Sequence, residues 1–279
     1  MFVLSLILAC GPKKDLSTQA SSEPVSHQVV PQAELQNQEA VDQLNPPSET
    51  KGIQSVEVLG AIPLSVEFEG IESDVFFRMR RLVVAPDGVV AAHEHQARPG
   101  VAYIVSGEID EFRDAQAVTR KKGDLSFEQT GVTHWWENRS GEQVTAIVVD
   151  ILSSNDIQGD PPYQAKVEHT ARESQGLDVQ ALGTLDLSAE HPALKDRILR
   201  ARHIEVAPDG AVGFHRHEGR PSFAYLLEGE MLEYRDDRES PIHHTSGTVA
   251  AERNGLGHWW KNGSEQPALF LVVDIVSAE

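Results

Sequence analysis

Two groups of three histidines have the residue types and the spacing of a metal site. The sequence holds twelve histidines, and half of them fall in these groups: His93, His95 and His134, and His215, His217 and His258. Side chains alternate between the faces of a strand, so both members of each His-x-His pair point the same way. A closed barrel can bring the third histidine, from a distant strand, against that pair. Three neutral imidazoles with room for solvent suit a catalytic divalent metal.

A plainer interpretation is that each triad is a hydrogen-bonded polar cluster or the remnant of an ancestral site. Buried imidazoles without partners are costly, however, and a metal ion removes that cost. The sequence therefore predicts up to two divalent ions per chain. It leaves their identity open among Fe, Mn, Zn, Ni and Cu.

Two arginines beside the histidine pairs are candidate catalytic residues. Arg98 and Arg220 each lie three residues after a pair. A guanidinium there could bind a substrate carboxylate near the metal. The alternative is an ion pair that fixes the loop, with Glu111 or Glu233 as the partner.

Two aromatic pairs near the histidines also have two interpretations each. Tyr103 and Tyr225 could donate a proton in the pocket, or they could pack in the core. Trp136 and Trp260 share strand parity with the third histidine, which predicts that they point into the barrel. They could stack on an aromatic or planar ligand there, but filling the core is the favoured role for these tryptophans.

Three further polar groups are expected at the surface. The pairs Arg78-x-Arg80 and Arg200-x-Arg202 have strand spacing and are expected to face solvent or the neighbouring domain. His243-His244 occurs in the second half of the chain only and is expected in a surface loop.

The histidines belong to a duplicated segment, and the copies are separated by 122 residues over their first part. Val84-Ala85-Pro86-Asp87-Gly88 recurs as Val206-Ala207-Pro208-Asp209-Gly210, a turn signal between two apolar runs. A period of this length indicates a domain duplication, because solenoid repeats run about 20–50 residues. Short β-branched runs bounded by Gly, Asp or Ser predict an all-β fold with two domains, at residues 51–155 and 166–279.

The duplicated motifs resemble the two-part signature of the cupin superfamily, present twice. The residues that carry the resemblance are Gly88, His93, His95, Gly107, Gly123, Gly131, His134 and Asn138, and then Gly210, His215, His217, Gly229, Gly247, Gly255, His258 and Asn262. The resemblance covers residues 51–279. It implies a bicupin: two tandem jelly-roll barrels (double-stranded β-helices), each with one metal inside.

The chain departs from the family pattern at one ligand. Most cupins have a glutamate where this chain has Gly100 and Ser222. Each metal is therefore expected to have three neutral ligands, a site that favours small anionic molecules. Glu128 and Glu252 lie six residues before the third histidine. They are expected to form outward-facing ion pairs, with a fourth metal ligand or a base as the alternative.

Two functions from different classes follow from the resemblance. The first is a metal-dependent enzyme of the dioxygenase, isomerase or lyase type that acts on a small anionic organic molecule. The three-histidine cupins that the chain resembles include non-haem iron dioxygenases for diketones, thiols and gentisate. The second is a non-catalytic protein that binds a ligand or a metal at the cell envelope.

Composition excludes some partners. Lys and Arg number 24 against 43 Asp and Glu, which gives a net charge of −19. This balance argues against nucleic acid, whose binding depends on basic residues that neutralise phosphates. The single cysteine excludes a disulfide framework within the chain and any multi-cysteine metal site. Association into a homo-oligomer is left open.

The apolar N-terminus resembles a bacterial lipoprotein signal. Residues 1–9 are almost wholly apolar, and Ile7-Leu8-Ala9 precedes Cys10, the one cysteine. The resemblance implies export, lipidation of Cys10 and a place in the cell envelope, at the outer membrane or in the periplasm of a Gram-negative cell. Residues 10–50 are rich in Gln, Ser, Glu and Pro, which predicts a disordered linker.

Overall fold

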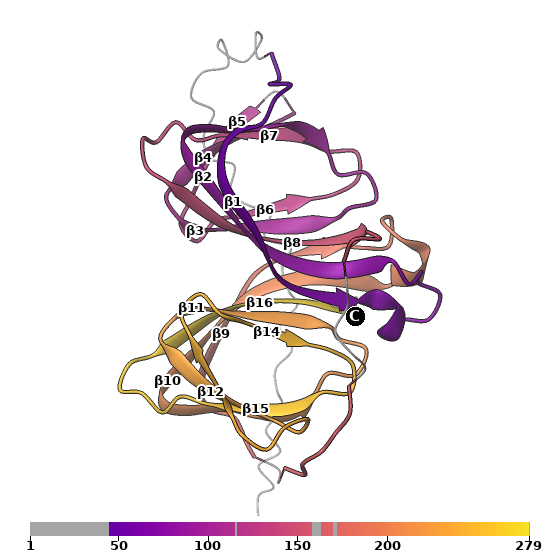
Figure 1. The fold of residues 1–279 in the computed structure, drawn as a ribbon, viewed down its shortest axis with the longest axis vertical. Helices are drawn as coiled ribbons and strands as arrows, with labels where there is room; N and C mark the ends of the chain where they lie inside the picture. The colour runs from indigo at the N-terminus through magenta and orange to yellow at the C-terminus, as the bar shows by residue number, and fades with distance from the viewer. Residues whose placement is uncertain (1–44, 115, 158–162, 170–171, 279) are drawn as a thin grey trace, which may run out of the picture. The chain divides into compact units, whose positions relative to one another are not determined.

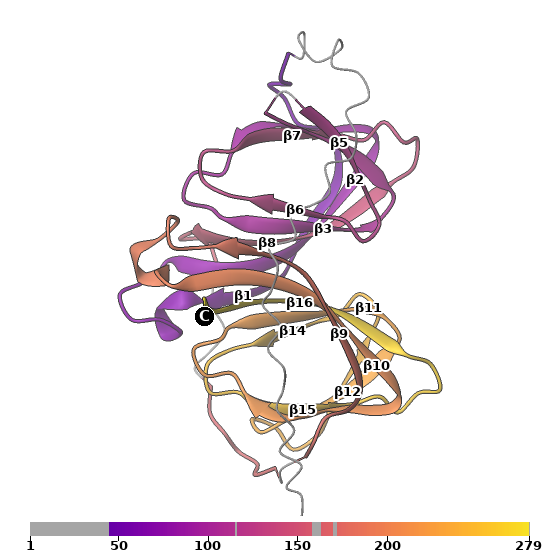
Figure 2. The same cartoon turned by 180° about the vertical axis from the view of Figure 1, so that it is seen from behind.

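Two eight-stranded antiparallel sheets dominate the computed structural model of the chain, which describes residues 45–114, 116–157, 163–169 and 172–278 (Figures 1 and 2). The predicted signal segment, Cys10 and most of the predicted linker lie outside the described residues. The first sheet contains β1 (Lys51–Pro63), β2 (Val75–Glu94), β3 (Gly100–Ser106), β4 (Glu108–Arg113), β5 (Gln116–Lys121), β6 (Leu125–Glu128), β7 (Thr133–Glu137) and β8 (Val144–Ser153). The second contains β9 (Gln175–Asp186), β10 (Arg197–Arg216), β11 (Ser222–Glu228), β12 (Glu230–Arg235), β13 (Ile242–Thr245), β14 (Val249–Glu252), β15 (Gly257–Lys261) and β16 (Ala268–Ser277).

The two sheets have the same strand order, which confirms both the duplication and the prediction of two tandem jelly-roll barrels. In the first the order is β5-β4-β7-β2-β8-β3-β6, with β1 beside β2. In the second it is β13-β12-β15-β10-β16-β11-β14, with β9 beside β10. The described helices are two single 3-10 turns, η2 (Leu64–Val66) and η3 (Pro192–Leu194). In the described part of the chain, no helix has the length and apolarity that a membrane crossing requires.

The Pro-Asp-Gly segments bend one long strand rather than join two separate strands. The first half of β2 pairs with β8, and the second half, beyond the bend, pairs with β7. Asp87 adopts a positive φ of 59° at the bend. Asn138, from the cupin motif, donates from its side chain to the carbonyl oxygens of Val84 and Ala85. The bend is therefore held from within the motif, and it carries β2 across to the strand that bears His134.

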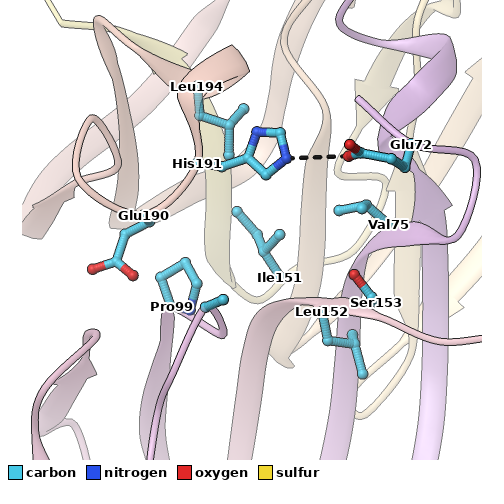
Figure 3. A pocket seen from close by; sticks show the side chains of 10 residues that line it. Glu72, Val75, Pro99, Ile151, Leu152, Ser153, Glu190, His191 and Leu194 are labelled. Atoms are coloured by element: carbon cyan, nitrogen blue, oxygen red, sulfur yellow. Dashed lines mark hydrogen bonds and ion pairs between the residues drawn. The ribbon is translucent and has the colours of Figure 1, made fainter. Parts of the chain in front are cut away.

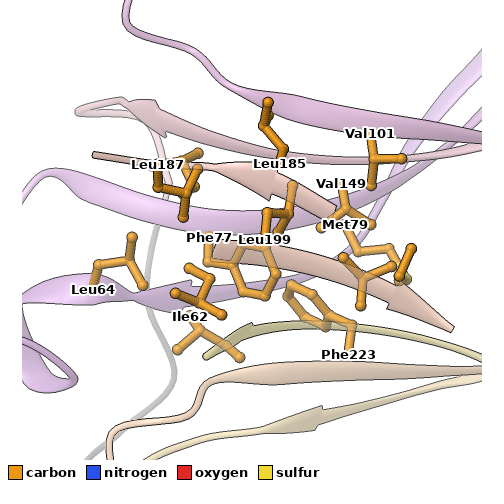
Figure 4. Close-up of a cluster of buried hydrophobic side chains, with 14 of the residues drawn as sticks. Ile62, Leu64, Phe77, Met79, Val101, Val149, Leu185, Leu187, Leu199 and Phe223 are labelled. Carbon is orange, nitrogen blue, oxygen red and sulfur yellow. The ribbon is translucent and has the colours of Figure 1, made fainter. Parts of the chain in front are cut away.

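The strands at the contact between the two barrels are buried on both faces. Inside the first barrel, Val84, Ala102, Ile104 and Val148 pack around Trp136. On the opposite face, a second cluster joins the barrels and includes side chains from both (Figure 4). At its centre the rings of Phe77 and Phe223 lie 4.9 Å apart. A residue on these strands consequently faces either a barrel interior or the other barrel.

Each barrel also binds a loop of the other through a glutamate. Glu67, just after η2, accepts a hydrogen bond of 2.7 Å from the backbone N–H of Asn254 in the second barrel. Glu190, just before η3, accepts one of 3.1 Å from the backbone N–H of Thr130 in the first. Both loops lead directly to the strand that carries the third histidine of their barrel.

Candidate metal centres

The fold brings each predicted histidine triad together inside its barrel. In each group the ligand atoms lie within 4.8 Å of one another. In the first barrel the Nε2 atom of His95 lies 3.1 Å from that of His93 and 3.0 Å from that of His134. Two ligands about 2.1 Å from one ion and at right angles to each other are about 3.0 Å apart. The spacing therefore matches three neighbouring positions around a single metal ion.

The second barrel repeats this geometry. Its three Nε2···Nε2 distances are 3.2 Å for His215 and His217, 3.0 Å for His217 and His258, and 3.1 Å for His215 and His258. The first histidine of each triad is partly exposed, whereas the second and third are buried. One side of each triad is thus open toward solvent.

Hydrogen bonds at Nδ1 fix the tautomer of each histidine. In the first barrel, His93 and His95 donate from Nδ1 to the backbone carbonyls of Ala91 and Arg98, at 2.8 and 3.1 Å. A carbonyl oxygen can only accept, so Nδ1 carries the proton and Nε2 presents a lone pair. In the second barrel the corresponding carbonyls belong to Gly213 and Arg220.

The third histidine of each barrel binds a buried carboxylate instead of a carbonyl. His134 donates from Nδ1 to Glu111 at 2.9 Å, and His258 donates to Glu233 at 2.8 Å. Burial acts to raise the pKa of each glutamate, but the partners outweigh it and the pKa lies below its ordinary value. An ionised carboxylate behind a ligating imidazole orients the ring and makes Nε2 a stronger donor to metal.

These contacts leave three lone pairs pointing at one another, which is unfavourable without a cation between them. Protonation of His95 or His217 does not relieve it near neutral pH. Burial lowers the pKa of His95 to about 3 and that of His217 to about 4. The arrangement therefore fits a divalent metal ion better than it fits a hydrogen-bonded cluster.

The charge behind the third histidine differs between the barrels. In the first, Arg113 and Arg120 both bind Glu111, each at 2.7 Å. In the second, His244 binds Glu233 at 2.9 Å. His244 lies opposite Met231 in the strand register, as Arg120 lies opposite Ile109. The expectation of a surface His244 is wrong, because this residue is 6 % exposed and faces the barrel interior.

The expectation that Glu128 and Glu252 face outward is also wrong. Both are buried beside the histidines. The carboxylate of Glu252 lies 3.4 Å from Nε2 of His217 and 3.6 Å from Nε2 of His258. That of Glu128 lies 3.8 Å from Nε2 of His134. Each site therefore has a carboxylate within reach of a fourth metal position, and the expectation of an all-neutral site no longer holds.

Strand register explains how the missing family glutamate is replaced. Gly100 lies directly opposite Glu128, and Ser222 lies directly opposite Glu252. The carboxylate thus comes from the neighbouring strand, at the same level of the barrel. Burial raises the pKa of Glu128 to about 7, whereas His217 and His258 outweigh burial and lower the pKa of Glu252.

Arg98 and Arg220 each lie near a buried aspartate of their own barrel. Nε of Arg98 is 3.9 Å from Asp150, and Nη1 of Arg220 is 4.0 Å from Asp274. The expected partners Glu111 and Glu233 are instead bound by the residues described above. A second role is visible in the backbone, because the carbonyl of each arginine accepts the Nδ1 proton of a histidine.

The sequence suggested that the Arg-x-Arg pairs face solvent or the neighbouring domain, and this expectation is wrong. Arg78 binds Asp150 through two hydrogen bonds of 3.0 and 2.7 Å, and Arg80 lies 3.4 Å from the same carboxylate. Arg200 and Arg202 bind Asp274 in the second barrel. These side chains point into the barrels, on the same face as Val84 and Val206.

The structure places Tyr103 and Tyr225 away from the histidines. Both belong to the cluster between the barrels. The phenol of Tyr103 shares a hydrogen bond of 3.0 Å with His203 of the other barrel. Tyr103 is an odd number of residues from Gly100, so strand alternation places the two on opposite faces. These positions support packing between barrels rather than proton donation at the metal.

Trp136 points into the first barrel, as its parity with His134 predicts. The two ring centroids are 6.2 Å apart. Its neighbours in the interior cluster are apolar, which supports the core-filling role. Trp260 has the corresponding position in the second barrel, 5.8 Å from His258.

A pocket between the barrels lies apart from both triads (Figure 3). None of the six histidines lines it. His191 and Glu72 face each other across it at 3.3 Å, from different barrels. Pro99 and Ile151 form part of its apolar wall.

The fold and the site define the class of this protein, and the comparisons with known proteins agree. The model of the cupin domain matches residues 80–150 and 202–274, so the chain belongs to the cupin family and carries the domain twice. It is similar to oxalate decarboxylase from Bacillus subtilis, with 13% identity over 86% of this chain and 80% of that one and a TM-score of 0.50. It is also similar to a salicylate 1,2-dioxygenase from Pseudaminobacter salicylatoxidans, with 11% identity, coverage of 71% and 70%, and a TM-score of 0.51. At these identities the likeness shows the fold alone. No curated protein matches the chain.

Proposed function

We propose that this protein is a metal-dependent bicupin that holds a divalent ion in each barrel and acts on a small organic anion there. The observation that carries the proposal is the convergence of three Nε2 lone pairs at 3.0–3.2 Å, with every Nδ1 proton already donated. The two similar solved structures are named for oxalate and salicylate, which are both small organic acids. This supports the ligand class.

The roles of the chain's own residues follow from their positions. The three histidines of each barrel would hold the ion, and Glu128 or Glu252 would offer a fourth oxygen. A bound divalent ion would supply an electrostatic anchor for a carboxylate and Lewis acidity for its reaction. Glu111 and Glu233 keep the third histidine in its metal-binding orientation. The partly exposed first histidine marks the side from which a ligand would approach.

Electron paramagnetic resonance of the Mn(II)-loaded full chain tests this proposal. Adding oxalate or salicylate should change the Mn(II) spectrum, because an anion that enters the coordination sphere alters its symmetry. A variant with alanine at His93, His95, His215 and His217 is the control and should give only free Mn(II). A spectrum of the bound ion that no acid alters would contradict anion binding at the metal.

Turnover separates an enzyme from a non-catalytic binding protein. The same metal-loaded protein is incubated with each acid, and oxygen consumption and product formation are followed. Coordination of the acid with turnover supports the dioxygenase, isomerase or lyase class. Coordination without any turnover supports a non-catalytic protein that binds the ligand.

We also propose that the protein is exported and anchored to a membrane through lipid on Cys10. The support is in the sequence, where Ile7-Leu8-Ala9 precedes the chain's one cysteine. In a Gram-negative host, Cys10→Ala should move the protein from the membrane fraction to the soluble fraction. Wild-type protein that is already soluble would contradict the anchor.

A further inference from the structure

Each barrel contains more arginine charge than its buried aspartate can neutralise. Asp150 is fully buried, and Arg78, Arg80 and Arg98 all lie within 3.9 Å of it. Arg78 alone forms two hydrogen bonds with this carboxylate. One carboxylate balances one guanidinium, and Glu128 offsets a second when it is ionised, so at least one positive charge remains. This is notable in a chain whose net charge is −19.

The second barrel has the same cluster. Asp274 is fully buried, and Arg200, Arg202 and Arg220 lie 2.8, 3.0 and 4.0 Å from it. Arg98 and Arg220 are about a third exposed, at 32% and 31%. The excess of positive charge therefore occurs in both barrels, and one arginine of each cluster is partly exposed to solvent.

The clusters lie at the same level of the barrel as the metal-facing carboxylates. Register places Glu128, Gly100, Asp150 and Arg78 side by side across four neighbouring strands. Adjacent strands are about 4.8 Å apart, so Glu128 and Asp150 are about 10 Å apart at the backbone. Because Gly100 has no side chain, none stands between them. Ser222 is the small residue at this place in the second barrel.

Several guanidinium donors in the clusters have no hydrogen-bond partner among the described residues. The Nε atoms of Arg80, Arg98 and Arg202 are buried and make no hydrogen bond. A buried donor without an acceptor is costly, and the cost is larger for a charged group. The clusters thus have both unused hydrogen-bond donors and unused charge beside the metal centre.

We propose that Arg80 with Arg98, and Arg202 with Arg220, bind a second carboxylate of the ligand whose first carboxylate lies at the metal. The ligand class is then a short dicarboxylate, with one end on the ion and the other on the guanidiniums. Arg78 and Arg200 hold the aspartate that keeps the other two arginines in place. The inference rests on the proposed function, because it needs an anion at the metal.

Calorimetric titration of the Mn(II)-loaded full chain with succinate and with butyrate tests the inference. The two acids have equal chain length and differ in the second carboxylate. Charge-assisted hydrogen bonds to that group should make succinate bind roughly tenfold to a hundredfold more tightly. Arg80→Gln combined with Arg202→Gln should remove this advantage, because it lowers the affinity for succinate far more than the affinity for butyrate. Arg139→Gln, which removes an exposed arginine paired with Glu137, is the matched control.

The outcomes distinguish the inference from the proposed function. Equal affinity of wild type for both acids would overturn the inference and leave metal-bound carboxylate, and so the proposed function, intact. Binding of neither acid to metal-loaded protein would overturn both. If the Arg80→Gln and Arg202→Gln variant loses metal, Arg98→Gln with Arg220→Gln repeats the comparison at the more exposed pair. If a metal-loaded variant of either arginine pair still binds succinate more tightly than butyrate, as the wild type does, the result would contradict the arginine site.

Discussion

At the scale of single residues, the metal centre is set up by what each imidazole does with its other nitrogen. All six ligating histidines donate from Nδ1, four to backbone carbonyls and two to carboxylates. The carbonyl partners are backbone groups two or three residues from each histidine. The carboxylates are the side chains of Glu111 and Glu233, which a substitution can change without altering the backbone atoms. They are therefore the residues at which metal affinity can be tuned.

Glu233→Gln should weaken metal binding in the second barrel by about tenfold to a hundredfold. Glutamine can still accept the proton of His258, but it lacks the charge that strengthens Nε2 as a donor. The measurement is Zn(II) affinity by chelator competition, in a background of His93→Ala and His95→Ala that leaves one site. Glu230→Gln, at an exposed glutamate of the same strand, is the control. Equal affinity of the two variants would contradict the role given to Glu233.

At the scale of elements, the strands at the contact between the barrels are buried on both faces. This decides which expectations could be derived from the sequence. The histidine triads could be derived from the sequence, because residue type and spacing together specify them. Alternation along β2 and β3 separates two sets of side chains but does not say which set faces the barrel interior. Arg78 was therefore assigned to the wrong surroundings. Tyr103 kept two interpretations, although its parity with Gly100 already favours packing between the barrels.

The predictions for Glu128 and His244 failed because strand parity does not carry across a loop and because short strands have no clear sequence pattern. The loop 129–132 lies between Glu128 and His134, and strand parity is lost across a loop. The inward direction of Glu128 could be seen only once its register opposite Gly100 was known. His244 belongs to β13, a strand of four residues that a sequence pattern hardly distinguishes from a loop.

Phe223→Ala should lower the free energy of unfolding by about 3–5 kcal/mol. Phe223 is fully buried and packs on Phe77 of the other barrel, so its loss leaves a cavity in the shared cluster. Urea unfolding measures the change, with Val179→Ala at a half-exposed strand position as the control. Metal content should stay the same, since Phe223 faces away from the histidines. A loss below about 1 kcal/mol would show that the cluster does not hold the barrels together.

At the scale of the whole molecule, the two barrels bind each other's histidine-bearing motifs. Glu67 accepts from Asn254, two residues after Glu252, and Glu190 accepts from Thr130, two residues after Glu128. The contact is reciprocal, so each metal-facing carboxylate lies next to a segment fixed by the other barrel. One of these glutamates also makes the assembly sensitive to pH.

Glu67→Gln should stabilise the protein at pH 8 and not at pH 4. Burial raises the pKa of Glu67 to about 7, against an ordinary value of 4.5. The folded state therefore holds a proton that the unfolded state releases, and stability falls as pH rises from about 4.5 to 7. At about 1.4 kcal/mol per pKa unit, the variant should gain up to about 3 kcal/mol at pH 8. Urea midpoints of both proteins across this range measure it, and a difference independent of pH would contradict the assignment.

The metal content of the purified full chain, measured by elemental analysis, tests the central claim most directly. Both triads converge with their lone pairs unused, so the wild-type protein should bind one divalent ion per barrel. His93→Ala with His95→Ala should lose about half of the metal, and adding His215→Ala with His217→Ala should remove the rest. Metal content that is unchanged in the fourfold variant would contradict the account, because the ions would then be held elsewhere.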